Sequence, residues 1–449
     1  MTTSTTTTSA PAHDRLLDQV RAVSLALVVL GHWLVGGLGY DGPVLRSASP
    51  LATMPWAAPL TWLVAVLGLF LCVGGRLSVE SWNRALSRDE TTGATRHQVG
   101  AVQRRGQVRV WRSWTGRRLG RLGRPLLPAV VAVGLVLAVA SAVGVPGATL
   151  ATAVRTMVQP LWFLGVYLLL TVATPALARL DERWGLRAVA TMAAMVAVID
   201  LVRFGPLAET VPSWFAWLAL APGWALAFQL GIWWSRNRRN PDGTGRGDQT
   251  GSGRTQRQVP SAKVGLGLLL AGVVGLVVLM GWAGYPVSMV GGGGVETRSA
   301  THPPTLTLLA LEAVAVGALW RWEEPLRRFF DRRTTAPSGL APHRPVARRL
   351  AGRLTSLLRT DPVGVLVWHQ AAALLPALAF AVLAPGTAVP GLTSAPTGPG
   401  WLLARLCWLP LFATLLALAG ERRQPERRPT GLTPDEERSL AGHGRTGRR

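Results

Sequence analysis

The first long apolar run of this chain, residues 16–38, carries three ionisable side chains, Asp18, Arg21 and His32. An ionisable group inside a membrane-spanning helix is costly to bury, so each is a candidate for function. Asp18 and Arg21 are three residues apart and can pair on one helix face. His32 follows Arg21 by eleven residues, which at about 100° each returns it to within about 20° of that face, roughly 16 Å further along. The spacing predicts that all three line one cavity.

The types of these residues suggest acid–base chemistry. A neutral imidazole accepts a proton from a hydroxyl, so His32 could serve as a general base. A structural reading also stands, in which His32 hydrogen-bonds a neighbouring helix. Arg21 could likewise extend to the inner interface, where Asp18 would only neutralise it.

A second cluster of cations precedes the third apolar run. Arg118, Arg121 and Arg124 are spaced three apart, so they lie along one side of a helix entering the membrane. Guanidinium groups bind phosphate through paired hydrogen bonds, which indicates a site for a phosphorylated donor. The alternative is the ordinary positive charge that flanks spans on the cytoplasmic side.

Further polar groups inside apolar runs are Gln229, Glu312, His369 and Arg405. Each could be structural or functional, and Glu312 and Arg405 could be partners. His302 lies in a loop predicted to be external, where it could touch an acceptor.

Ten apolar runs supply elements that could hold these groups in a membrane. The predicted spans are residues 16–38, 57–76, 125–145, 160–180, 186–203, 214–234, 264–283, 304–321, 363–385 and 399–419. The fifth and eighth runs are the weakest, because charged residues end or interrupt them.

The distribution of arginine sets the orientation. Twelve arginines lie from Arg76 to Arg124, ten from Arg321 to Arg359, and eight in the C-terminal tail. Cytoplasmic loops are enriched in Lys and Arg, so both termini are expected in the cytoplasm. The sequence therefore predicts an all-α polytopic transmembrane helix bundle of about ten spans.

The same pattern divides the chain into three parts. Residues 1–13 are expected to be a disordered cytoplasmic N-terminus, 14–420 the transmembrane domain, and 421–449 a basic cytoplasmic tail. The Arg-rich cytoplasmic loops are expected at about 77–124, 235–263 and 322–362.

Composition argues against a soluble or nucleic-acid-binding protein. Of 449 residues 49% are hydrophobic, and the net charge of +24 is clustered between apolar runs rather than spread over a basic globular segment. Cys72 and Cys407 both fall inside apolar runs, so no disulfide framework is implied. The sequence contains no Walker loop, no H-E-x-x-H and no C-x-x-C, and we expect no metal site.

The polar motifs occur in an order that resembles the acyltransferase-3 family of integral-membrane acyltransferases. The hallmark of that family is an Arg, ten residues and then a His, which Arg21 and His32 match, and Asp18 matches its acidic residue three before the Arg. Further matches in the same order are Phe70–Gly75, Arg118–Arg124, Pro160–Leu164 and Trp368–Gln370. At Gly74 a serine is usual in the family.

This resemblance implies transfer of an acyl group, commonly acetyl, from cytoplasmic acyl-CoA to a hydroxyl of a surface glycan, lipid or metabolite. It implies that His32 is catalytic, as base or acyl carrier, with Arg21 and Asp18 as its companions. On the donor side we expect Arg118, Arg121, Arg124, Trp162 and His369. Acyl-CoA is expected as a co-substrate, with no bound cofactor, and the bacterial plasma membrane is the expected location.

Many members of that family carry an extracellular hydrolase-like domain after the last span. This chain is expected to have only the membrane domain, which favours one-step transfer within it. The rival interpretation is a transporter or lipid flippase, which also buries charged groups but performs no covalent chemistry.

Overall fold

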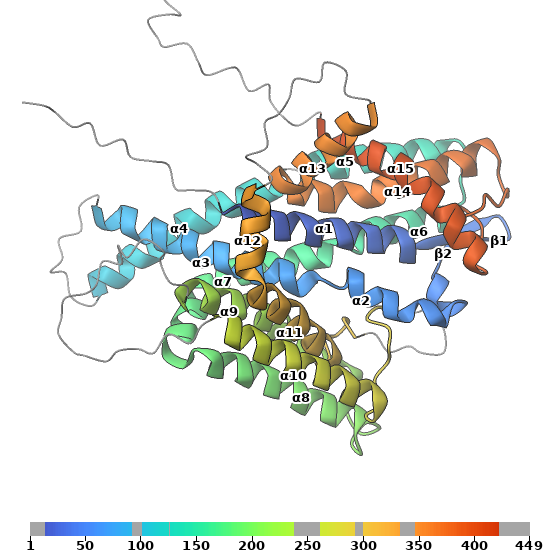
Figure 1. The fold of residues 1–449 in the computed structure, drawn as a ribbon. Helices are drawn as coiled ribbons and strands as arrows, with labels where there is room; N and C mark the ends of the chain where they lie inside the picture. The colour runs from blue at the N-terminus through green and yellow to red at the C-terminus, as the bar shows by residue number, and fades with distance from the viewer. Residues whose placement is uncertain are drawn as a thin grey trace, which may run out of the picture.

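The computed structural model describes residues 14–91, 101–124, 126–237, 261–291, 300–332 and 346–421. The predicted N-terminal segment 1–13 lies outside these ranges, as does the predicted tail 421–449 apart from its first residue. Parts of the three predicted cytoplasmic loops also lie outside. The described residues form a bundle of α-helices with one short β-hairpin (Figure 1).

The helices of the first half of the chain are α1 Arg15–Val35, α2 Thr61–Val64, α3 Leu67–Thr91, α4 Ala101–Gly123, α5 Leu126–Ala142, α6 Gly147–Val158, α7 Leu161–Trp184 and α8 Leu186–Phe204. Those of the second half are α9 Leu220–Asn237, α10 Ser261–Gly281, α11 Leu306–Arg321, α12 Glu323–Arg332, α13 Val346–Thr360, α14 Pro362–Leu383 and α15 Pro399–Glu421.

Among the described residues, eight helical segments are long and apolar enough to cross a membrane. They coincide with eight of the ten predicted spans. The other two are α8, which carries Asp200 and Arg203, and α11, which has only 16 residues. Both belong to the bundle, because α8 packs on α9 and α11 runs along α10. The protein is therefore an all-α polytopic helix bundle, as the sequence predicts, and it has a helix at each predicted position.

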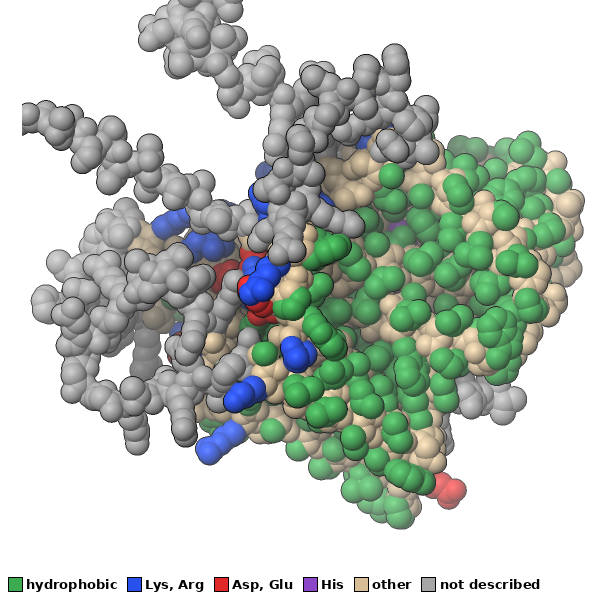
Figure 2. Space-filling view, in the orientation of Figure 1, with side chains coloured by type: hydrophobic (Ala, Val, Ile, Leu, Met, Phe, Trp, Pro, Cys, Tyr) green, Lys and Arg blue, Asp and Glu red, His purple; other side chains and the backbone are tan. Residues whose placement is uncertain are grey.

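The surface of the bundle suits a lipid environment. Figure 2 shows hydrophobic side chains over the faces of the helices, whereas the visible Lys and Arg side chains gather toward one end. On α10, Leu270, Val274 and Val277 are more than half exposed. Large apolar patches of this kind are rare on soluble monomers and mark a surface that meets lipid or another protein.

Small residues let the central helices approach closely. A Cβ on Gly75 of α3 would meet the carbonyl oxygen of Phe228, and a Cβ on Gly231 of α9 would meet that of Cys72. In a membrane, where lipid tails are as apolar as leucine, such close backbone packing is a main source of helix association. The pair α3–α9 therefore forms the rigid centre on which α7, α8 and α11 pack.

Two features depart from continuous helices. The predicted span 57–76 is broken, since α2 ends at Val64 and α3 begins at Leu67. After α1, strands β1 Gly37–Asp41 and β2 Val44–Ala48 pair antiparallel, a hairpin that the sequence did not predict. Its two-residue turn contains Gly42 at φ 58°, a left-handed conformation that glycine adopts without strain.

Helix α1 occupies the position that matters for function. It packs between α3 and α14, and its first turns also meet α12 and α13 (Figure 1). Leu17 joins the core of α3, α7 and α9, whereas Leu25 and Val29 join that of α14 and α15. The residues of α1 are therefore held from both sides.

Candidate active site

Two histidines from opposite ends of the chain meet inside the bundle. His32 lies near the C-terminal end of α1, and His369 lies in the second turn of α14. Nδ1 of His32 is 2.9 Å from Nε2 of His369, and the rings stack with centroids 5.0 Å apart. His369 is completely buried. The pair is a hydrogen-bonded imidazole dyad within the membrane domain.

The partners of the dyad fix where its protons lie. Nδ1 of His369 is 3.2 Å from the carbonyl oxygen of Val365, which can only accept, so this nitrogen carries the hydrogen. In the neutral ring Nε2 of His369 is then an acceptor, and Nδ1 of His32 donates to it. Nε2 of His32 then carries no hydrogen and has a free lone pair. The indole of Trp33 holds the backbone of α14 in place by donating to the carbonyl of His369 over 2.8 Å.

His32 opens on a cavity of about 410 Å³, which we call the outer cavity because the predicted topology places this end of α1 outside. Nε2 of His32 has no partner among the described residues, so its lone pair is directed to this space. Polar residues that also line the outer cavity are Ser47, Ser49, Thr156, Gln159, Trp162, Thr301, His302, Gln370 and Arg405.

Trp162 and His302 form one wall of the outer cavity. Their rings meet edge to face with centroids 4.1 Å apart. Burial lowers the pKa of the His302 imidazole below its ordinary value, so this ring is mainly neutral at pH 7. Trp162, expected on the donor side, thus lies at the end of α7 that faces the outer cavity.

Arg405 is held by the backbone. Its Nε donates to the carbonyl of Trp33 over 2.6 Å, Nη2 to that of Gly36 over 2.9 Å, and Nη1 to that of Gly391 over 3.0 Å. Two of these carbonyls belong to the C-terminal end of α1, where cations are stabilising. Arg405 of α15 therefore anchors the end of α1 beside His32.

A second cavity, of about 150 Å³, begins at Arg21 and is the inner cavity. It shares Val28 and Leu67 with the outer cavity, so the two adjoin along α1. Arg21 donates to the carbonyl of Arg359 over 2.7 Å and lies 3.7 Å from Asp18. Arg21 and His32 thus open on two adjoining cavities rather than on the single cavity that their spacing predicts, and Asp18 lines neither of these two cavities.

A family model described as an acyltransferase domain, that of the acyltransferase-3 family, matches residues 14–342, or 329 of the 449 residues. The chain belongs to this acyltransferase family. It is therefore a membrane acyltransferase, as its apolar helices and its motifs indicate. No curated protein and no solved structure matches the chain. The family match ends before α14, so the contact between His32 and His369 is known from the structure alone.

The three arginines expected on the donor side of this acyltransferase have different surroundings. Arg118 donates to the hydroxyl of Ser78 over 3.0 Å and stacks on Trp114. Arg121 lines a cleft of about 380 Å³ between α3 and α4. Arg124 is exposed. The structure therefore does not bring the three into one site.

The cleft between α3 and α4 adds cations that the motif does not contain. Arg84, Arg88 and Arg117 line it together with Arg121, and we call it the arginine cleft. The sequence offered a signal, because Arg84 and Arg88 are one helical turn apart on α3. The sequence did not show that α4 packs against α3, so the cleft between them could be found only in the structure.

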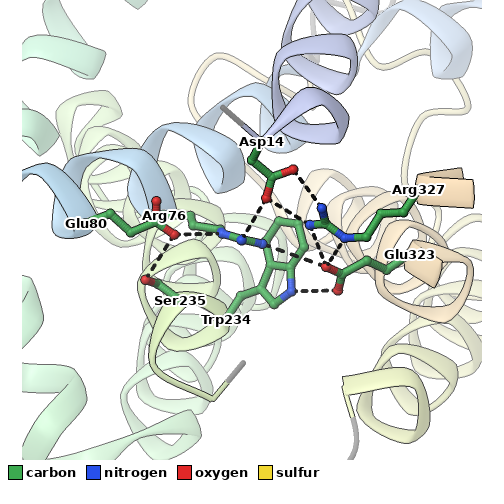
Figure 3. Close-up of polar contacts among 7 residues, drawn as sticks. All are labelled: Asp14, Arg76, Glu80, Trp234, Ser235, Glu323 and Arg327. Atoms are coloured by element: carbon green, nitrogen blue, oxygen red, sulfur yellow. Dashed lines mark hydrogen bonds and ion pairs between the residues drawn. The ribbon is translucent and has the colours of Figure 1, made fainter. Parts of the chain in front are cut away.

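Sequence reasoning missed a cluster of charged residues that the described part of the structure brings together (Figure 3). The guanidinium of Arg76, 2% exposed, contacts Asp14 at 3.1 Å, Glu80 at 3.0 Å and Glu323 at 3.9 Å. Arg327 binds Asp14 at 2.8 Å and Glu323 at 2.9 Å. We call these five residues the cytoplasmic charge cluster, because the predicted topology places this end of α1 on the cytoplasmic side.

The surroundings of the cytoplasmic charge cluster complete it. Arg76 lies over the ring of Trp234, 4.2 Å from its centroid, and the indole of Trp234 donates to Glu323 over 3.0 Å (Figure 3). The contacts join the start of α1 to α3, α9 and α12. Each charge has at least one opposite charge close by. We therefore interpret the cluster as structural, fixing these helices relative to one another.

Gln229 and Glu312, the other polar residues noted inside apolar runs, have different surroundings. Gln229 donates to the carbonyl of Leu177 over 3.2 Å and links α9 to α7. Glu312 of α11 is 1% exposed and has no hydrogen-bond partner among the described residues. Since the three nitrogens of Arg405 donate to backbone carbonyls, the pairing of Glu312 with Arg405 considered from the sequence does not occur here.

Proposed function

We propose that this membrane acyltransferase moves an acyl group, most simply acetyl, from cytoplasmic acyl-CoA to a hydroxyl of a surface glycan, lipid or metabolite. The observation that carries the proposal is the pair of adjoining cavities along α1, from Arg21 to the open nitrogen of His32. A thioester entering from one side and an alcohol from the other would meet there. Acyl-CoA serves as co-substrate, and the bacterial plasma membrane is the proposed location.

In the proposed reaction, Nε2 of His32 takes the proton of the acceptor hydroxyl as its oxygen attacks the thioester carbonyl carbon. The bond to sulfur then breaks, and the proton passes from His32 to the departing thiolate. His369 keeps the lone pair of His32 on the cavity side, because it accepts from the other nitrogen. An acyl-His32 intermediate is the variant in which Nε2 itself attacks the thioester.

On the donor side, the phosphate groups of CoA would bind guanidiniums at the cytoplasmic end. Arg121 in the arginine cleft and Arg21 at the mouth of the inner cavity support this assignment. Arg118 would position α4 on α3 through Ser78. Trp162 and His369 would act at the acyl end of the donor, since both lie by the outer cavity or its imidazole dyad.

The test is acyl transfer by the purified protein in detergent, followed as release of CoA thiol from acetyl-CoA in the presence of acceptor extracts. His32→Ala is expected to lower kcat by about 10²–10⁴-fold, the range typical of a lost general base. His302→Ala removes another imidazole from the same cavity and is the matched control, with kcat expected within about threefold and any loss confined to the KM for the substrates. Undiminished turnover by His32→Ala would overturn the proposal, as would movement of substrate with no covalent change.

A further inference from the structure

Gln370 is a buried amide that has no hydrogen-bond partner among the described residues. It follows His369 on α14 and is 5% exposed. Its side chain makes no hydrogen bond with any described residue. Neither of its polar atoms is sealed from open space, and the residue lines the outer cavity together with His32. Its amide is therefore directed into the space where the reaction is proposed.

The cavity face of α14 is built around this amide. Gln370, Ala373 and Leu374 line the outer cavity, at the i, i+3 and i+4 spacing of one helix face. The small side chain of Ala373 leaves room beside the amide. His369 lies on the adjoining face and is turned toward His32. Helix α14 thus holds the base with one residue and presents an amide to the cavity with the next.

The neighbouring donors are already committed. Nδ1 of His32 donates to His369, the indole of Trp33 donates to the carbonyl of His369, and each nitrogen of Arg405 donates to a backbone carbonyl. An amide that faces the cavity loses its water when a ligand enters, which is costly unless the ligand supplies a hydrogen-bond partner. Unpartnered groups of this kind are common where a ligand completes the hydrogen bond.

We propose that Nε2 of Gln370 donates a hydrogen bond to the carbonyl oxygen of the acyl group and stabilises the oxyanion that forms there. This inference rests on the proposed acyltransferase function. When the acceptor oxygen bonds to the carbonyl carbon, the π electron pair moves to the carbonyl oxygen, and His32 holds the acceptor proton. When the pair returns, the carbon–sulfur bond breaks and the thiolate takes the proton from His32. An acyl-His32 intermediate would form and decay through the same oxyanion.

The expected size of the effect separates this role from simple binding. Removing one donor from an oxyanion site typically lowers kcat by about 10²–10³-fold and leaves substrate affinity nearly unchanged. A residue that only orients the acceptor would instead raise the KM for the acceptor.

The experiment compares Gln370→Met with the wild type and with Gln159→Met. Methionine has nearly the volume of glutamine but no N–H donor, and Gln159 lines the same cavity while exposed. For Gln370→Met we expect kcat to fall by about 10²–10³-fold, with both KM values within about threefold. The melting temperature should be nearly unchanged, because the amide makes no hydrogen bond with any described residue. Gln159→Met should keep kcat within about threefold.

Two results would overturn the inference. One is a kcat of Gln370→Met within about threefold of wild type, and the other is a raised acceptor KM at unchanged kcat. A lower melting temperature with unchanged kcat would show a structural role instead. Failure of the proposed function looks different, because then the wild type transfers no acyl group or His32→Ala is as active as wild type. If the wild type is active and His32→Ala is not, only the role of Gln370 is at stake.

Discussion

The acyltransferase contains two groups of buried polar side chains that differ in one respect. In the cytoplasmic charge cluster, the guanidinium of Arg76 is surrounded by three carboxylates and an indole ring. Around the outer cavity, Nε2 of His32 and the amide of Gln370 have no partner among the described residues. Both regions hold groups that are costly to bury. In the first, the charges offset one another, although Nη1 of Arg76 lies 3.9 Å from Glu323 and makes no hydrogen bond. In the second, the groups without a partner line a cavity that a substrate can enter.

This difference separates the polar groups that stabilise the fold from those that are available to a substrate. A buried charge whose partners are all present fixes helices relative to one another, and its loss is felt as instability. A buried donor or lone pair that faces open space contributes nothing to the fold and is available to a substrate. The following variants test the distinction, from the largest expected effect to the smallest.

Arg76→Leu should be the most damaging change. It leaves Asp14, Glu80 and Glu323 clustered with Arg327 as the remaining cation of the cluster. Breaking a buried ion network in this way costs about 3–5 kcal/mol in the free energy of unfolding. The measurement is thermal or denaturant unfolding in detergent. Any protein that stays folded should keep its kcat within about threefold, and a loss of kcat without loss of stability would contradict the structural reading.

His369→Leu should lower kcat rather than the stability of the fold. It removes the acceptor for Nδ1 of His32, so the lone pair of His32 is no longer confined to the cavity side. We expect kcat to fall by about 10²-fold, equivalent to about 2.7 kcal/mol of transition-state stabilisation. His369→Gln retains an oxygen able to accept from His32 and should recover part of the rate. Equal rates for the Leu and Gln variants would argue against an orienting role.

Val28→Trp tests the junction between the two cavities. Val28 is 7% exposed and lines both, so an indole at this position should block the passage. We expect acyl transfer to fall by at least about tenfold, equivalent to about 1.4 kcal/mol, while CoA still raises the melting temperature. Val23→Trp is the matched control, because Val23 is 53% exposed on the same helix. Undiminished transfer by Val28→Trp would mean that the substrates meet by another route.

Arg328→Leu should have the smallest effect. Arg328 pairs with Glu324 at 2.9 Å one turn along α12, but the two side chains are 68% and 65% exposed. Exposed pairs of this spacing contribute about 0.3–0.5 kcal/mol, so the unfolding free energy should barely change. Comparing Arg→Leu at positions 76 and 328 thus measures how burial changes the contribution of an ion pair to the free energy of unfolding. A similar loss at both positions would remove the contrast.

The sequence predicted that Asp18, Arg21 and His32 line one cavity, and the structure agrees with this only in part, because Asp18 lines neither of the two cavities described above. Arg21 and His32 lie on adjoining cavities because their eleven-residue spacing is a property of the helix itself. A helix lies at each of the ten positions predicted from apolar runs, although α8 and α11 are not among the eight segments long and apolar enough to cross a membrane. The β-hairpin after α1 was missed, since two five-residue strands separated by Gly42 and Pro43 carry little periodic signal.

Other parts could not have been predicted. Arg118 and Arg121 share a motif but reach Ser78 and the arginine cleft respectively, because neighbouring helices decide which guanidinium is enclosed. Asp14 and Arg327 are paired although 313 residues apart. No local pattern specifies such a pairing.

The sequence by itself determined that this chain crosses membranes, which helices form and which face of α1 is polar, because these depend on hydropathy, charge bias and helical periodicity along one segment. The tertiary structure alone decided that His369, 337 residues after His32, supplies the second imidazole and that Arg405 secures the end of α1. It also decided that Gln370 has no partner among the described residues. The physical reason is that hydrogen bonding between helices depends on packing distances of a few ångströms, which the sequence of either helix does not contain.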